Sequence, residues 1–179
     1  MKCSATVLAA GFAGLMLTSS LPAAATVVLV KTNLGNFEVN LFDQTTPLTV
    51  ANFLTYVKNG SYNDTLFHRS LPGFVLQGGG FKYSGNNTAP FTATAVLAPV
   101  KNEVLYSNLR GTIAMAKQQG KPDSATNQWF INLADNSQNL DTQNSGFTVF
   151  GQVTGNGMEI IDAIAKLPTN LATGFAEVP

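Results

Sequence analysis

The residues with the clearest chemical potential lie together in one short segment, residues 67–79. The segment contains a cation, Arg69, and an amide, Gln77, in an otherwise apolar stretch that closes on consecutive glycines. A buried cation rarely occurs without a partner or a task, because removing its charge from water is costly. A fixed guanidinium donates several charge-assisted hydrogen bonds, so this segment is suited to stabilising charge that develops on a bound molecule.

The composition excludes most other catalytic chemistries. The single cysteine, Cys3, lies in the N-terminal leader, so a mature chain has no thiol for a disulfide, a zinc-thiolate site or a nucleophile. His68 is the one histidine, which leaves no imidazole pair for a metal and makes any catalytic triad depend on it. Ser70 and Ser124 lack the nucleophile-elbow pattern of a small hydrolase. We therefore expect His68 to be a structural residue.

Segment 67–79 resembles the signature of the cyclophilins, which are peptidyl-prolyl isomerases. That signature reads Phe-His-Arg, four residues, Phe, two residues and Gln-Gly-Gly, and each of its positions is matched here. The resemblance continues in the family's order through 111–116, 124–132 and 140–151. It covers about residues 26–168. The compact, secreted bacterial members are the most similar in style.

The resemblance implies a role for each matched residue. Arg69 would be the catalytic guanidinium, and Gln77 would hold Arg69 or a substrate carbonyl. Phe74, Phe130 and Leu140 would form the walls of a proline pocket. The further substrate-binding positions are Val75, Met115, Ala116, Lys117, Gln128 and Phe147. Of these, residues 116 and 117 would act through backbone groups. The alternative for the apolar positions is an ordinary place in the core, where aromatic residues of strands are usually found.

Rotation about an X-Pro bond breaks no covalent bond, so an isomerase needs no nucleophile. Its barrier of roughly 18–20 kcal/mol reflects the loss of amide resonance. As resonance is lost, the proline nitrogen gains a lone pair, and a donor on Arg69 aimed there or at the adjacent carbonyl interacts best with the twisted state. We expect an isomerase that acts on proline-containing polypeptides and needs no metal or organic cofactor. The alternative is a binding module of the same fold that captures such segments without turnover.

The chain departs from many cyclophilins at Asn139, where those proteins carry Trp or another aromatic residue before the groove leucine. The resemblance therefore implies weak binding of cyclosporin-type ligands, with peptide turnover less affected. The 10 Lys and Arg residues balance 10 Asp and Glu residues, which leaves no basic footprint for nucleic acid or anionic lipid. We expect a monomer.

The N-terminus predicts a secretory signal peptide over residues 1–25. Lys2 provides a positive charge, residues 7–17 form an apolar run, and residues 22–25 offer a small-residue cleavage site. The run is shorter than the roughly 20 apolar residues of a membrane span. We expect cleavage, release into the periplasm or the medium, and no membrane attachment afterwards. The remaining residues 26–179 have the size of one domain.

The elements that must position this chemistry are mainly short strands. Alternating apolar residues and turn residues predict strands at 26–32, 37–42, 67–70, 74–77, 112–116, 129–132 and 149–153. The first two strands are expected to form a β-hairpin. Loops are expected over 82–98, 118–126 and 135–146. Many short strands with few helices indicate a mainly β barrel or sandwich.

Two amphipathic helices are predicted, at 46–60 and 156–166. Thr46 is expected to cap the first helix, with Pro47 in its first turn. The resemblance implies an eight-stranded antiparallel β-barrel capped by these two helices. The family's last strand has no counterpart here, so we expect a C-terminally truncated domain. The alternative is an open barrel with an exposed edge at 26–32.

Overall fold

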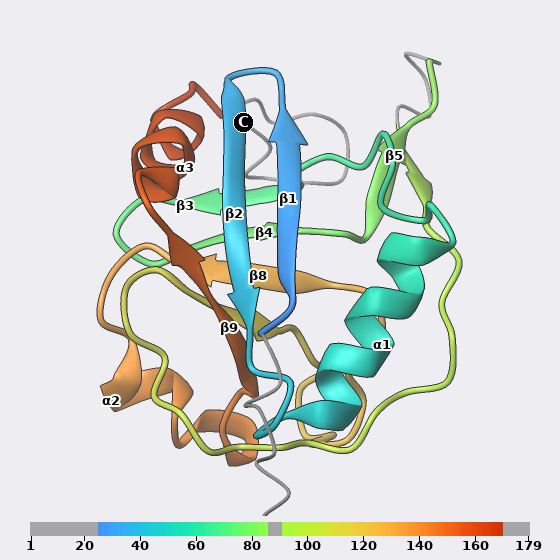
Figure 1. The fold of residues 1–179 in the computed structure, drawn as a ribbon, viewed down its shortest axis with the longest axis vertical. Coiled ribbons are helices and arrows are strands. Elements are labelled where there is room, and N and C mark those ends of the chain that lie inside the picture. The colour runs from blue at the N-terminus through green and yellow to red at the C-terminus, as the bar shows by residue number, and fades with distance from the viewer. Residues whose placement is uncertain (1–24, 86–90, 170–179) are drawn as a thin grey trace, which may run out of the picture.

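The computed structural model describes residues 25–85 and 91–169. Within these residues, seven strands form one antiparallel sheet in the order β1-β2-β9-β7-β8-β4-β3. They are β1 (Val27–Thr32), β2 (Gly35–Leu41), β3 (Arg69–Leu71), β4 (Val75–Gly78), β7 (Thr112–Met115), β8 (Trp129–Asn132) and β9 (Val149–Thr154). The sheet curls, so that β1 and β2 cross over β3, β4 and β8 (Figure 1). This arrangement confirms the mainly β, barrel-like prediction.

The β1–β2 hairpin shows how alternation builds the interior. Val28 faces Val39 across the pair, and the connection at 33–34 leads into Gly35, whose φ of +139° suits a residue without a side chain. Phe37, Val39 and Leu41 are buried, while the residues between them in β2 are exposed or half-buried. The hairpin is thus confirmed with its predicted inward face.

The main core fills the space inside the curled sheet. Phe53 lies at its centre, with its ring 5.0 Å from that of Phe150, 5.3 Å from Tyr62 and 6.3 Å from Trp129, measured between centroids. The strand residues Leu76, Ile113, Met115 and Ile131 are fully buried in the same cluster. Burial of each large apolar side chain in this way contributes about 1.5–3 kcal/mol to the stability of the folded protein.

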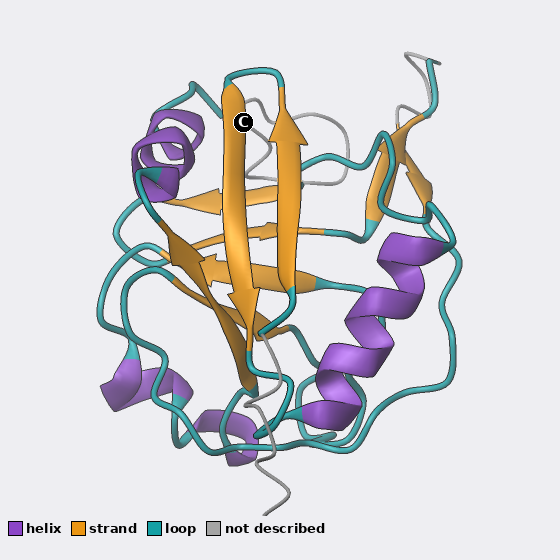
Figure 2. Ribbon diagram, in the orientation of Figure 1, coloured by secondary structure: helices purple, strands orange, loops and turns teal. Residues whose placement is uncertain are grey.

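Both predicted helices are present, as α1 (Pro47–Lys58) and α3 (Gly157–Ala165), and each lies against the sheet (Figure 2). Thr46 occupies the N-cap position of α1 as predicted, but its hydroxyl does not cap the helix and donates to the Phe42 carbonyl (3.2 Å). The carboxylate of Glu103 instead accepts hydrogen bonds from the backbone N–H groups of Leu48 (3.2 Å) and Thr49 (2.8 Å). A carboxylate is favourable there because the helix N-terminus carries partial positive charge.

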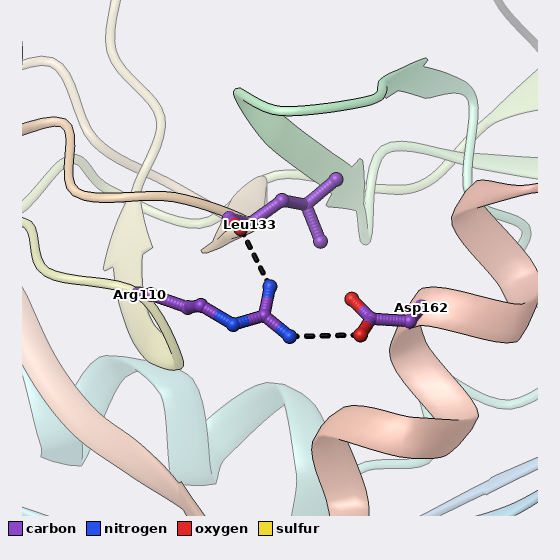
Figure 3. A network of polar contacts seen from close by, with 3 residues as sticks. All are labelled: Arg110, Leu133 and Asp162. Carbon is purple, nitrogen blue, oxygen red and sulfur yellow. Dashed lines mark hydrogen bonds and ion pairs between the residues drawn. The ribbon is translucent and has the colours of Figure 1, made fainter.

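Helix α3 is held by close packing and by a polar contact. A Cβ atom added at Gly157 would lie 2.6 Å from a methyl group of Val153, so only glycine permits this approach. The Arg110 guanidinium donates to the Leu133 carbonyl (2.6 Å) and to the Asp162 carboxylate (2.8 Å), joining the segment after β8 to α3 (Figure 3). The pair is partly exposed, so it contributes less than about 1 kcal/mol.

Two of the three predicted loops contain regular structure. The strands β5 (Phe81–Tyr83) and β6 (Phe91–Ala93), which overlap the predicted loop 82–98, form a separate two-stranded sheet. Within 135–146 there are the short helix α2 (Ser137–Leu140) and the 3-10 helix Gln143–Ser145. These elements span three or four residues each, too few to show a hydrophobic period in the sequence. The segment 118–126 is a loop, as predicted.

The described part of the sheet has β1 and β3 at the two ends of its strand order. A cleft of about 850 Å³ opens between β1 and residues 62–67, with the rings of Phe53 and Trp129 in its lining. All but the last residue of the predicted signal peptide lies outside the described residues. The C-terminal end, where a truncation is predicted, also lies outside them. Across those residues, no helix is long and apolar enough to cross a membrane.

Candidate active site

One row of side chains crosses four strands of the sheet. Arg69 of β3 pairs with Gln77 of β4, Gln77 pairs with Phe130 of β8, and Phe130 pairs with Ala114 of β7. Residues directly opposite each other in antiparallel strands point to the same face. Their neighbours Leu76, Ile113 and Ile131 belong to the main core, so the row stands on the outer face. The strand register thus brings Arg69, Gln77 and Phe130 next to one another on one face of the sheet.

A second apolar cluster, which we call the pocket cluster, surrounds this row. Its buried members are Val75, Ala114, Phe130, Leu140 and Val149, and its partly buried members are Phe42, Phe74, Ala116 and Phe147. The rings of Phe130 and Phe147 meet edge to face, with centroids 5.7 Å apart and planes at 74°. The cluster therefore brings together all three predicted pocket walls, with three further predicted substrate-binding residues.

Of the apolar residues predicted for the site, Met115 is the one that lies outside this cluster. Its side chain is fully buried in the main core, on the opposite face of β7 from Ala114. Sequence reasoning missed Ala114 and Val149. Period-two alternation was the available signal, since these residues lie two positions from Ala116 and Phe147.

The amide of Gln77 is oriented by a second amide. Gln77 Nε2 donates to Oε1 of Gln128 at 2.8 Å, so the second predicted glutamine lies beside this member of the row. The backbone N–H of Ala116 donates to the Gln128 carbonyl at 2.9 Å. Any backbone contact from Ala116 to a peptide would therefore use its carbonyl group.

His68 is 5% exposed and packs its ring edge against Phe81, with centroids 4.9 Å apart. Burial lowers its pKa to about 4, although hydrogen bonds with Gln128 and the Leu66 backbone oppose that shift. The imidazole is thus neutral near pH 7 and poorly suited to accept a proton there. Within 25–85 and 91–169, no group of three His, Cys, Asp or Glu side chains is placed to hold a metal ion.

Residues 27–177 match the family described as cyclophilin type peptidyl-prolyl cis-trans isomerase/CLD. The chain belongs to this family. It is 44% identical over 169 residues to a peptidyl-prolyl cis-trans isomerase of Acinetobacter baylyi, across 93% of this chain and 86% of that protein. It is 45% identical over 181 residues to peptidyl-prolyl cis-trans isomerase A of Dickeya dadantii, across 97% and 90%. This cyclophilin is therefore a peptidyl-prolyl cis-trans isomerase.

Solved structures show the same fold. A cyclophilin type isomerase of Cryptosporidium parvum superposes with a TM-score of 0.66 at 24% identity, over 83% of this chain and 88% of that one. A structure of that protein determined in the presence of the dipeptide Ala-Pro also gives a TM-score of 0.66, at 23% identity over 85% and 90%. The curled sheet is thus the cyclophilin fold.

A buried network of amides supports the pocket cluster of this cyclophilin. Asn132 is fully buried, and its Nδ2 donates to Asn108 Oδ1 (3.2 Å) and to Thr112 Oγ1 (2.9 Å). Its Oδ1 accepts a hydrogen bond of 2.7 Å from Asn136, which also donates to the Phe74 carbonyl (2.9 Å). The network therefore fixes the backbone at Phe74, one of the predicted pocket walls.

The other end of the network lies beside Leu140, another predicted pocket wall. The next residue, Asp141, accepts hydrogen bonds at Oδ1 from the backbone (2.8 Å) and side chain (2.9 Å) of Asn108. Partial burial opposes ionisation of Asp141, but the bonds from Asn108 hold its pKa below the usual range. The Leu140 carbonyl accepts from the N–H of Phe147 at 3.0 Å. Both walls are therefore positioned by satisfied polar contacts.

Proposed function

We propose that Arg69 is the catalytic group of this isomerase and that Gln77 positions it or binds a substrate carbonyl. The observation that carries this proposal is the cross-strand row, in which Arg69, Gln77 and Phe130 share one face of the sheet. Arg69 is half-buried and stands two strands from Phe130 in this register, which supports the proposal. A donor in that position can reach a peptide whose proline ring lies against Phe130.

The mechanism is binding of the twisted amide in preference to either planar isomer. Phe74, Phe130 and Leu140 hold the pyrrolidine ring while the peptide on its other side rotates. Arg69 then donates to the lone pair that appears on the proline nitrogen, or to the adjacent carbonyl. A hydrogen bond from a charged group contributes about 1.5–3 kcal/mol, which corresponds to roughly 10- to 150-fold in rate.

The substrates proposed here are proline-containing polypeptides that fold outside the cytoplasm. Two observations support this. A relative of the same fold has been crystallised in the presence of Ala-Pro, and residues 1–25 of this chain have the pattern of a secretory signal peptide. The proposed compartment is the periplasm or the medium, and the proposed state is a monomer. Fractionation of cells that produce the full chain tests the compartment, because a protein retained whole in the cytoplasm would contradict it.

The experiment that tests the catalytic role uses the mature chain from Thr26 and exchange spectroscopy of an Ala-Pro peptide by NMR. The parent is expected to accelerate cis-trans exchange, and Arg69→Ala is expected to lose about 10-fold or more while remaining folded. Arg110→Ala is the matched control, because Arg110 contacts α3 rather than the pocket cluster. A folded parent that binds the peptide without accelerating exchange would favour the binding-module alternative.

We further propose that cyclosporin-type ligands bind weakly. Asn139 is exposed and directly precedes the pocket wall Leu140. It therefore offers a short amide where many members of the family present an aromatic ring. Titration calorimetry tests this, and a nanomolar dissociation constant would contradict it. Asn139→Trp is the matched variant, and it is expected to bind more tightly than the parent.

A further inference from the structure

The turn before Phe147 has an unusual backbone. Asn144, Ser145 and Gly146 have φ values of 53°, 62° and 73°, so three consecutive residues adopt left-handed conformations. Such residues other than glycine cost about 1–3 kcal/mol each and persist only where the surroundings hold them. The turn leads directly into Phe147, whose ring meets the edge of Phe130. Whatever holds the turn therefore also sets one wall of the pocket cluster.

The Lys117 side chain contacts both ends of this turn. Its ammonium group donates to the carbonyl of Asn144 at 3.0 Å and to the carbonyl of Gly146. The same nitrogen lies over the Phe147 ring, 4.9 Å from the centroid, within the range of a cation-π interaction. One charged group thus binds two carbonyls of the strained turn and the aromatic wall that follows it.

We propose that Lys117 is a positioning residue of the isomerase, whose ammonium group holds the 144–146 turn and thereby fixes Phe147 against Phe130. The inference rests on the proposed proline pocket. The sequence comparison placed Lys117 in the site through its backbone, whereas the structure gives its side chain a separate task. Partial burial lowers the pKa of the ammonium group, partly offset by the charge of Asp123, in agreement with a group withdrawn from water.

Other contacts hold the same turn, so loss of the ammonium group should loosen it without unfolding the domain. The Asn144 side chain accepts from the N–H of Gly120 (3.1 Å) and donates to the carbonyl of Gln118 (2.9 Å). Asn102 Nδ2 also donates to two carbonyls of the turn, those of Ser145 and Gly146, each at 3.0 Å. Lys117 differs from these residues because it also contacts the aromatic wall.

The test compares Lys117→Met with Lys117→Arg in the mature chain. Methionine keeps the apolar stem and removes the charged donor, whereas arginine keeps a donor of the same charge. We expect Lys117→Met to weaken the affinity for an Ala-Pro peptide by about 3- to 10-fold, because the pocket wall must then be ordered on binding. Exchange of the bound peptide should change by less than about 2-fold, and Lys117→Arg should restore affinity. Lys121→Met is the matched control, an exposed lysine of the same loop.

The measurements are an NMR titration for affinity and exchange spectroscopy at saturating peptide for the rate. Unchanged affinity in Lys117→Met would overturn the proposal. A loss seen with a Glu-Pro peptide but not with Ala-Pro would also overturn it, since Lys117 would then be a ligand for acidic substrates. If Lys117→Met does not fold, Asn102→Ala is the deciding variant. It removes two other hydrogen bonds to the same turn and should weaken affinity with little change in the bound rate. A normal affinity in that variant would refute the proposal.

Arg69→Ala should instead slow exchange of the bound peptide. Failure of the catalytic proposal can therefore be distinguished from failure of the proposal for Lys117.

Discussion

Acidification should destabilise this cyclophilin through a single imidazole, that of His68. The side chain is 5% exposed and its pKa in the folded protein is about 4, against an ordinary value of 6.5. As the pH falls below 6.5, the unfolded chain binds a proton at His68 that the folded protein does not bind until about pH 4. The free energy of unfolding therefore falls with pH across this window.

The size of the effect follows from the two pKa values. Each pKa unit corresponds to about 1.4 kcal/mol, so the difference between 6.5 and about 4 gives a complete loss of about 3–4 kcal/mol, of which about 3 kcal/mol is lost by pH 4. Between about pH 7 and pH 5.5 the expected loss is about 1 kcal/mol. The lowered pKa values of Asp43 and Asp141 act below their ordinary 3.8, so these carboxylates contribute little in this interval.

The assay is urea denaturation of the mature chain at about pH 7 and about pH 5.5, with His68→Gln as the control. Glutamine can form hydrogen bonds but does not titrate. The parent should lose about 1 kcal/mol on acidification and the variant should lose much less, even if the variant is less stable at both pH values. Equal losses in both proteins would refute the reasoning, because the proton would then bind elsewhere.

Three further substitutions test other parts of the structure. Asn132→Leu removes the centre of the buried amide network and should cost about 2–4 kcal/mol in urea denaturation while weakening peptide affinity. A cost below about 1 kcal/mol would show that the network is dispensable. Gly79→Ala should cost about 3 kcal/mol or more in the same assay, since φ is +84° and the new Cβ would lie 2.5 Å from the Asn127 carbonyl oxygen. Arg110→Met removes a partly exposed pair and should change the free energy of unfolding by less than about 1 kcal/mol, with exchange catalysis unchanged; a larger loss would mean that α3 depends on this contact.

Local patterns were sufficient to predict the main strands and both long helices. In β2, alternation placed Phe37, Val39 and Leu41 on one face, and that face lies in the core. The spacing between Arg69 and Gln77 is local too, because one tight turn at 72–74 joins their strands and fixes their pairing. Such features depend on residues close in sequence, which is why the sequence sufficed for them.

Contacts between distant segments could not be predicted in this way. Glu103 caps α1 although it lies 55 residues from Leu48 along the chain. Local rules consider only residues next to the helix, and they therefore favour the Thr46 hydroxyl. Lys117 reaches carbonyls 27 and 29 residues further on, and no spacing rule joins those positions. Met115 is different, because the alternation that places Ala114 on the outer face already requires Met115 to face inward. That assignment followed the family resemblance and overlooked the strand period.

The inner face of the sheet packs the main core, and its outer face carries the pocket cluster. In β8, Ile131 points into the main core, while its neighbour Phe130 points outward to the pocket cluster. The packing that stabilises the fold therefore also immobilises the strand that carries the pocket. Rigidity matters for this reaction, because the twisted and planar amides differ by a rotation and not by a change in covalent structure. A donor on Arg69 can favour the twisted state only if it is held in place relative to the ring pocket before the peptide rotates. In the mechanism proposed here, the amide network behind Phe74 and the ammonium group of Lys117 beside Phe147 supply that fixed geometry from outside the row of Arg69, Gln77 and Phe130, so substitutions in either place should weaken peptide binding.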